Sequence, residues 1–363
     1  MQTKRQFITS GAALIAMPAF QGCSGNSISD VAKMAASLRA PIPMVPEYRE
    51  FIRFATLAPN GHNTQPWKFK IQDNQISILP DMTRRTKVVD PDDHHIYVSL
   101  GCAAENLCLA AAANGRPCLT VFREEGEGQI DIDLAKGPAV ATDLYGAIPK
   151  RQSTRSVYDG RSVSTEHLRS LEAAASIDGV SMTLITDAKQ LSDVLDFVVE
   201  GNSAQMDDPA FVNELKRWIR FNPDHAMKTR DGLYGPCSGS DTSVPAWIGR
   251  PMFGQFFEKD AENEKYVQHV KSSSGIAVFT GDRSDKDHWI RVGRSFQRFA
   301  LKATVLGIRH AHINQPIEVP SVRSAFANWL GIPGQRPDLV IRFGYAPPMP
   351  MSLRRAVGAV IIE

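Results

Sequence analysis

The chain has 363 residues, of which 43% are hydrophobic and 22% charged, enough to form one large domain or two closely packed ones. Its 41 lysines and arginines nearly balance 39 aspartates and glutamates, and no basic tract is dense enough to indicate a nucleic-acid partner. No apolar run reaches the roughly 20 residues that a membrane-spanning helix needs.

Residues 1–23, MQTKRQFITSGAALIAMPAFQGC, have the order of an export signal: a basic start, a short apolar stretch and a small residue before Cys23. TKRQFIT resembles a twin-arginine signal with Lys4 in place of the first arginine, and FQGC resembles a lipoprotein processing box. We therefore predict an exported, periplasmic bacterial protein, with lipidation of Cys23 as its only membrane contact. The alternative is an ordinary amphipathic N-terminal helix. Residues 24–44 are predicted to form a tether.

A polar connection, LAPNGHNTQPWKF, follows a predicted helix that ends near Leu57 and precedes a predicted strand–turn–strand. Its neutral hydrogen-bonding side chains are those of Asn60, His62, Asn63 and Gln65. Gly61 has no side chain and would allow a close approach to the backbone at this point. The alternative interpretation is a polar turn that only caps the helix.

DPDDHHIYV places Asp92, Asp93, His94 and His95 together. Adjacent residues on a helix diverge, and no pair has the i, i+4 spacing that two ligands on one helical face need. We therefore predict a solvated helix N-terminus with acidic capping and no metal site.

Two segments, YVSLGCAAENLCLAAAANG (97–115) and WIRVGRSFQRFALKATVLG (289–307), align without a gap. Gly101 matches Gly293, and Gly115 matches Gly307 at the end, where a helix C-cap favours glycine. Each copy follows a strand-like run, which favours an internal duplication. The first copy is apolar almost all round and is predicted to be buried at the centre. We predict two halves, 45–140 and 141–363, forming a pseudo-dimer in one chain.

The second half begins with IPKRQSTRSVYDGRSV, in which Arg151, Ser153 and Arg155 alternate and would point the same way from an extended segment. Two guanidiniums and a hydroxyl suit a dianionic phosphate, although the pattern alone is also typical of a solvated turn. Residues 205–266 form a long insertion rich in Trp, Phe, Gly and Pro, which we interpret as a lid over a site.

Together, APNGHNTQPW and RQSTR resemble the nitroreductase family of FMN-dependent oxidoreductases. RRTKVVDP (84–91) and INQPIEVP (313–320) resemble most its single-chain, Acg-like branch. The likeness covers most of residues 45–363 and is weakest in the insertion. It implies an α+β fold of two sheet-plus-helix halves fused as an intramolecular pseudo-dimer.

In this family FMN lies at a homodimer interface, where one subunit provides the phosphate cradle and the other the polar loop. Here the loop occurs only in the first half and the cradle only in the second, so the resemblance implies one FMN per chain. The implied phosphate-binding residues are Arg151, Gln152, Ser153, Arg155, Arg354 and Arg355. The implied ring-binding residues are Pro59, Asn60, Gly61, Asn63 and Gln65, with Pro316, Ile317 and Glu318 near the reactive N5. Val319 stands where the family often has glycine.

The predicted function is hydride transfer through flavin N5 to a small, flat, aromatic or conjugated substrate. We assign no catalytic side chain, because the cofactor performs the difficult step. The alternative is a non-catalytic flavin-binding or sequestering protein whose ring is covered by the insertion. Relatives usually take electrons from NAD(P)H, which is not expected outside the cytoplasm. An exported protein would use a redox partner as its electron donor, or would oxidise a substrate instead.

Overall fold

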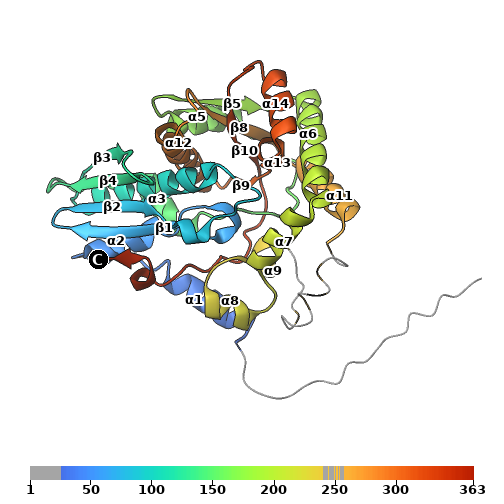
Figure 1. The fold of residues 1–363 in the computed structure, drawn as a ribbon. Helices are drawn as coiled ribbons and strands as arrows, with labels where there is room; N and C mark the ends of the chain where they lie inside the picture. Colours follow the sequence, from blue (N-terminus) through green and yellow to red (C-terminus); the bar gives the residue numbers. More distant parts are fainter. Residues whose placement is uncertain (1–25, 240–243, 245–248, 250, 252, 254–256) are drawn as a thin grey trace, which may run out of the picture.

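The computed structural model describes residues 26–363 except 240–243, 245–248, 250, 252 and 254–256. The predicted export signal and Cys23 lie outside the described residues. The described chain contains two large, mainly antiparallel sheets with helices packed on and between them (Figure 1), which confirms the predicted α+β fold class.

The first sheet combines strands from the first half with one strand from the C-terminus. Its order is β11-β1-β2-β4-β3, and all neighbours are antiparallel except β11, which runs parallel to β1. The strands are β1 (Trp67–Gln72), β2 (Gln75–Pro80), β3 (Cys118–Arg123), β4 (Gln129–Leu134) and β11 (Ile361–Ile362). The helices α2 (Tyr48–Ala55) and α3 (His94–Ala113) pack on this half.

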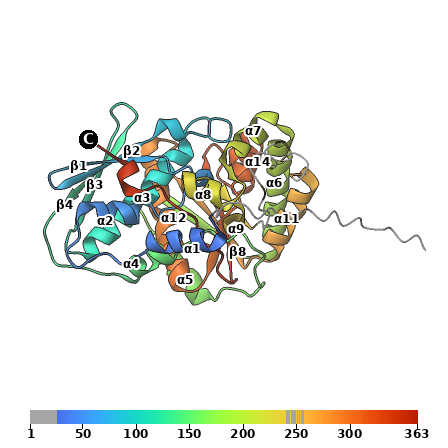
Figure 2. The ribbon, with the colours of Figure 1, turned by 90° about the horizontal axis from the view of Figure 1, so that it is seen from below.

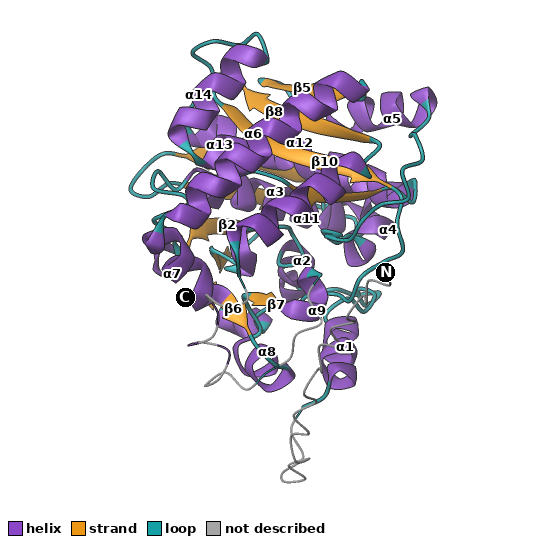
Figure 3. Ribbon diagram, turned by 90° about the vertical axis from the view of Figure 1, so that its right-hand side faces the viewer, coloured by secondary structure: helices purple, strands orange, loops and turns teal. Residues whose placement is uncertain are grey.

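The second sheet repeats the arrangement of the first. Its strands are β5 (Val180–Ile185), β8 (Gly275–Gly281), β9 (Arg309–His312) and β10 (Pro337–Gly344), in the order β5-β8-β10-β9. If the four strands of each half are numbered along the chain, both sheets have the order first-second-fourth-third, as in β1-β2-β4-β3. In each half, one long helix connects the second strand to the third. These helices are α3 and α12 (Lys286–Val305). Figure 3 shows β5, β8 and β10 surrounded by helices. The repeated topology confirms the predicted pseudo-dimer.

The two long helices cross at the glycines that the sequence alignment matches. A Cβ atom added at Gly101 would lie 2.0 Å from the carbonyl oxygen of Ile290. One added at Gly293 would lie 2.0 Å from the carbonyl oxygen of Val98. Each helix therefore needs glycine where the backbone of the other passes. The crossing joins the halves in a reciprocal way, as a two-fold interface does.

Polar side chains also connect these two helices, and the side chains differ between the two halves. The carboxylate of Glu105, 2% exposed, accepts hydrogen bonds from Arg294 at 3.0 Å and from Arg298 at 2.9 Å. The amides of Asn106 and Gln297 are 2.6 Å apart. The α3 helix is also long and apolar enough to span a membrane by composition alone, but 78% of its most apolar window is buried inside the protein. It is the central core helix that its composition predicts.

Two segments of the second half contact the first half. Helix α4 (Asp143–Ala147) packs on α12 and also on α3 of the first half. At the other end of the chain, the backbone N–H of Phe69 donates to the carbonyl of Val360 at 2.8 Å, beside the pairing of β11 with β1. Both segments run along the join between the halves.

The insertion lies between β5 and β8. It begins with α6 (Ala188–Asp207) and ends with α11 (Lys259–Lys271). Between them the described elements are α7 (Pro209–Trp218), β6 (Ile219–Arg220), α8 (Pro223–Thr229), β7 (Leu233–Tyr234) and α9 (Gly235–Ser238). The predicted tether contains α1 (Ile28–Ser37), which packs beside α8 (Figure 2). Small apolar side chains such as Val31 and Ala226 are buried at this contact.

Candidate functional site

Two cavities meet at the join between the halves. The larger has a volume of about 530 Å³ and the smaller about 50 Å³. Both are lined by Pro59 and Asn60 from the first half, by Arg155 from the second and by Leu233 from the insertion, so the two spaces adjoin. The larger volume lies within the range of small-molecule sites.

The polar loop after α2 forms one wall of both cavities. Pro59, Asn60, Gly61 and His62 line the larger space, and Asn63 lines the smaller one. The Oδ1 atom of Asn60 accepts a hydrogen bond from the backbone of Gln65 at 2.7 Å, which closes the loop on itself. A Cβ atom added at Gly61 would meet no other atom within 4 Å, so the space beside this glycine is open.

The amides of Asn63 and Gln65 are engaged by other parts of the protein. Asn63 donates to the carbonyl of Gly232 at 3.0 Å and accepts from Arg354 at 3.0 Å. Gln65 lines neither cavity; it donates to the carbonyl of Arg230 and accepts from the backbone of Arg355. These side chains fasten the insertion and the C-terminal segment to the loop. Their predicted contact with a flavin ring stays a prediction.

The structure brings the predicted phosphate cradle together around the smaller cavity. Ser153 forms a parallel β-bridge with His310, which keeps the segment extended as the alternation predicts. The predicted residues that line the cavity are Arg151, Gln152, Ser153, Arg155 and Arg354. Arg39, which follows α1, also lines it and was not predicted, because no local pattern marks a single arginine in a tether.

The guanidiniums at the smaller cavity lack anionic partners. Arg151 donates from Nη2 to the carbonyl of Leu57 at 3.0 Å, while its Nε and Nη1 are buried without a hydrogen bond. Arg354 donates to backbone carbonyls, including that of Thr56 at 2.7 Å. Among the described residues, no carboxylate forms an ion pair with Arg39, Arg151, Arg155 or Arg354.

Burial makes these charges electrostatically costly. It lowers the pKa of Arg151 to about 10 and that of Arg39 to about 10, and it holds the pKa of Arg354 well below its ordinary value. A guanidinium at pH 7 nevertheless remains charged. The smaller cavity therefore presents poorly solvated positive charge, which an anion would stabilise.

Gln152 positions the C-terminal segment at this cavity. Its Nε2 donates to the carbonyl of Met349 at 2.8 Å, and its Oε1 accepts from the backbone N–H of Met349 at 2.6 Å. This pair of hydrogen bonds aligns the segment that carries Arg354.

Besides Gln65, three predicted residues lie outside both cavities. Arg355 points to the carboxylate of Asp81 at 3.5 Å and to the carbonyl of Ala359 at 2.9 Å. Pro316 and Ile317 are buried within α13 (Gln315–Glu318). Their neighbours Gln315 and Glu318 line the larger cavity.

The insertion covers much of the larger cavity with apolar side chains. Its contribution includes Phe211, Leu215, Ile219, Phe221, Leu233 and Tyr266. Burial raises the pKa of Tyr266 to about 12, so its hydroxyl stays protonated at neutral pH. This wall suits a flat apolar molecule. The interpretation of residues 205–266 as a lid stays a prediction.

Polar groups of the larger cavity come from elements distant in the sequence. His62, His95 and His312 all line it, together with Glu318. Desolvation lowers the pKa of His62 to about 4 and that of His312 to about 3, so both are neutral at pH 7. His95 and His312 were not predicted to line a cavity, because their proximity depends on how the two halves pack.

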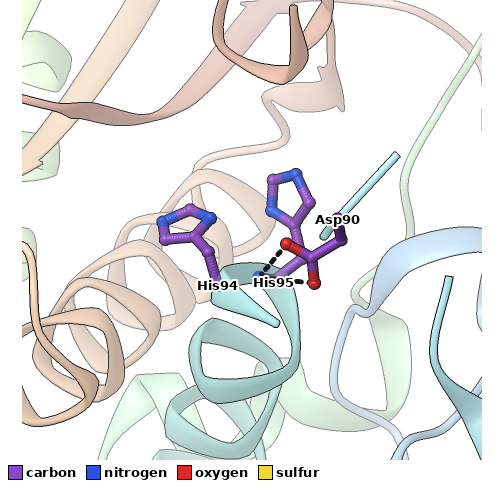
Figure 4. A group of neighbouring side chains, drawn as sticks. All are labelled: Asp90, His94 and His95. Atoms are coloured by element: carbon purple, nitrogen blue, oxygen red, sulfur yellow. Dashed lines mark hydrogen bonds between the residues drawn. The ribbon is translucent and has the colours of Figure 1, made fainter. Parts of the chain in front are cut away.

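Asp90, His94 and His95 each place a side-chain atom within 4.8 Å of the others (Figure 4). The oxygens of Asp90 accept from the backbone N–H of His95 at 3.0 and 3.1 Å, at the first turn of α3. The Nε2 atom of His94 is 2.9 Å from the carboxylate of Asp338. Asp90 therefore caps the first turn of α3, while the absence of a metal stays a prediction. The prediction of a solvated helix end is wrong for Asp93 and His94, which are buried.

No protein-family model matches the chain. Among curated proteins, it is similar to a "Putative NAD(P)H nitroreductase" of Mycobacterium tuberculosis, with 23% identity over 343 residues that cover 91% of this chain and 95% of the relative. It is also similar to "Putative NAD(P)H nitroreductase acg" of the same organism, with 22% identity, covering 85% of this chain and 93% of the relative. A crystal structure of a nitroreductase with bound FMN from Bacteroides fragilis aligns with 57% of this chain and 90% of its own, with 16% identity and a TM-score of 0.35. The curated relatives confirm the predicted resemblance to the nitroreductase family.

Proposed function

From the resemblance of nearly the whole chain to nitroreductases, we propose that the protein is an FMN-dependent oxidoreductase that reduces a small, aromatic or conjugated acceptor. When bound, FMN would supply hydride through its N5 atom. The protein would bind one FMN across the join of its halves, because the polar loop and the arginine cradle meet only there.

The cluster of unpaired arginines at the smaller cavity is the observation that carries this proposal. Burying a charge without a counter-ion is costly, and Arg151 keeps two guanidinium nitrogens without partners. A phosphate group would supply the missing acceptors, since a guanidinium binds phosphate oxygens in a bidentate manner. Arg39, Arg151, Ser153, Arg155 and Arg354 would hold it.

The larger cavity suits the ring of the same molecule. It begins at Pro59 and Asn60, which also line the phosphate end, and it is open beside Gly61. A flat ring can therefore extend from the cradle along the polar loop. The apolar wall of the insertion would then face the ring or an acceptor stacked on it.

Export of the protein is a further part of the proposal. The relatives are named as NAD(P)H nitroreductases. A periplasmic protein would instead receive its electrons from a redox partner or from a reduced substrate. Twin-arginine export moves folded proteins with their cofactors bound, and this is compatible with an FMN loaded in the cytoplasm. Mass spectrometry of the mature N-terminus would reveal whether Cys23 is lipidated.

The double substitution Arg151→Ala with Arg155→Ala tests the phosphate assignment. We expect loss of FMN from the purified protein with the fold retained, because two charges of the cradle are removed. FMN released by heat is measured by fluorescence, and the fold by circular dichroism and Tm. The control is Arg123→Ala with Arg169→Ala, which removes the same charge from exposed sites. Unchanged FMN content in the first variant would show that the phosphate lies elsewhere.

The visible spectrum separates catalysis from sequestration. We expect a yellow protein that is bleached by dithionite and reoxidised by nitrobenzene. A flavin that is reduced but reoxidised by no acceptor would instead support the sequestering alternative, in which the insertion covers the ring. A colourless protein that FMN cannot reconstitute would contradict both functions.

A further inference from the structure

A chain of polar contacts from three elements lines the larger cavity. His95, in the first turn of α3, has its Nε2 atom 3.3 Å from Oε1 of Glu318 at the end of α13. The other carboxylate oxygen of Glu318 accepts from Gln205 of α6 at 2.7 Å. The side chains of His95 and Glu318 are 15% and 16% exposed, and both line the cavity. The pair is thus sheltered but faces the space that an acceptor would enter.

Charged and titratable groups face His95 from every side. They are Asp90, His94, Glu318, Arg336, Asp338, His62 and His312. Burial disfavours the charged imidazole, and Arg336 opposes it as well. Asp90 and the hydrogen bond to Glu318 outweigh these effects and raise the pKa of His95 above 6.5. Although burial acts in the opposite direction, the contacts with His95 and Gln205 lower the pKa of Glu318.

The three histidines of the cavity therefore differ in the direction of their pKa shifts. The low pKa values of His62 and His312 leave them neutral at pH 7, as described above. Asp90 and Glu318 instead favour the imidazolium form of His95. An imidazolium carries a proton on both nitrogens, and only Nε2 is engaged by Glu318. Its Nδ1 hydrogen is a second donor, and no described residue accepts a hydrogen bond from it.

We propose that His95 is the proton donor of the larger cavity and that Glu318 is its positioning residue. The inference rests on the proposed function and adds to it an acid that the family resemblance did not imply. Reduction of a nitro group to a nitroso group takes a hydride and a proton, breaks one N–O bond and releases the oxygen as water. Reduced FMN, when bound, would supply the hydride. His95 would donate the proton, become neutral imidazole and regain a proton from solvent.

A single-turnover experiment tests this role. The FMN-loaded protein is reduced with dithionite, and its reoxidation by nitrobenzene is followed from pH 5 to pH 9. For the wild type we expect the rate to fall as pH rises through the pKa of His95, above 6.5, because the imidazolium is lost there. For His95→Gln we expect a rate about 100-fold lower with no such fall, since general acid catalysis typically contributes about 100-fold or more. Glu318→Gln should move the fall to lower pH.

The control variant is His288→Gln. His288 forms a similar pair with Asp285, Nδ1 to Oδ1 at 2.8 Å, at the first turn of α12 and outside both cavities. We expect its rate and pH profile to equal those of the wild type. FMN content, measured for each variant, separates a failure of this proposal from a failure of FMN binding. A His95→Gln protein that retains FMN and reoxidises at the wild-type rate would overturn the proposal.

A second measurement does not depend on the flavin reaction. The imidazole of His95 is titrated by NMR in the wild type and in Glu318→Gln, with its signal assigned by its loss in His95→Gln. We expect a pKa above 6.5 in the wild type and a lower one in Glu318→Gln. A wild-type pKa below 6.5 would overturn the assignment, because burial would then outweigh the two carboxylates that favour the imidazolium.

Discussion

Gly61 leaves room in the larger cavity at the turn of the polar loop. The first heavy atom of any side chain placed there meets nothing within 4 Å, so a longer one would extend into the proposed ring site without displacing protein atoms. Asn60, its neighbour, holds the loop by its bond to the backbone of Gln65. Substitution of Gly61 should therefore leave the fold intact but weaken flavin binding.

For Gly61→Leu we predict FMN binding weakened at least tenfold, about 1.4 kcal/mol, with Tm close to that of the wild type. The measurement is titration of the apoprotein with FMN, followed by flavin fluorescence. Gly146→Leu is the control, because Gly146 is exposed in α4, outside both cavities, and a Cβ there also meets nothing within 4 Å. Equal FMN affinity in the two variants would show that the ring does not pass Gly61.

Among single residues, the sequence predicted those whose spacing along the chain determines the direction of their side chains. The alternation of Arg151, Ser153 and Arg155 placed all three at one cavity, because an extended segment has a period of two. Arg39 and His95 were not predicted as lining residues, since their positions depend on packing between distant segments. The amide of Gln65 fitted a polar site by type but was used by the insertion and the C-terminal segment.

At the scale of elements, the crossing of α3 and α12 holds the two halves together. Gly101 and Gly293 let the backbones approach so closely that neither site has room for a methyl group. The obstacle in each case is a carbonyl oxygen of the opposite helix, which no side-chain rotation can move. The cavities lie along the same join, so the crossing also fixes the distance between the polar loop and the cradle.

We predict that Gly101→Ala destabilises the protein by about 1–3 kcal/mol or more, the usual cost of overpacking a core, and lowers FMN content. Chemical denaturation gives the free energy of unfolding. Gly146→Ala is the matched control: in the exposed α4 helix it should be neutral or stabilising, because alanine favours helix more than glycine does. A Gly101→Ala protein as stable as the wild type would contradict the close crossing.

The sequence predicted the long helices and their duplication because their glycines and flanking strands match. It did not predict the pairing of β11 with β1, since a two-residue strand has no periodicity of its own. The predicted limits of the insertion, 205 and 266, fall within α6 and α11, so composition did not locate the ends of these helices.

At the scale of the whole molecule, the two halves share a sheet order but differ in the loops that would bind a ligand. The connection between α2 and β1 occupies residues 56–66 and carries the polar loop, whereas the equivalent connection between α5 (Thr165–Ala175) and β5 occupies only residues 176–179. The arginine cradle precedes α5, and its sequence has no counterpart before α2. A pseudo-symmetric chain can thus retain one ligand site of two.

The stoichiometry of FMN tests this account most directly. The purified protein is denatured, its released FMN is quantified by absorbance, and the value is divided by the protein concentration from amino-acid analysis. Light scattering of the native protein gives the number of chains per particle. We predict one FMN per chain, including in particles of a single chain, because both parts of the site come from the same polypeptide. Two FMN per chain, or binding only in particles of two or more chains, would contradict a single site built by complementary halves.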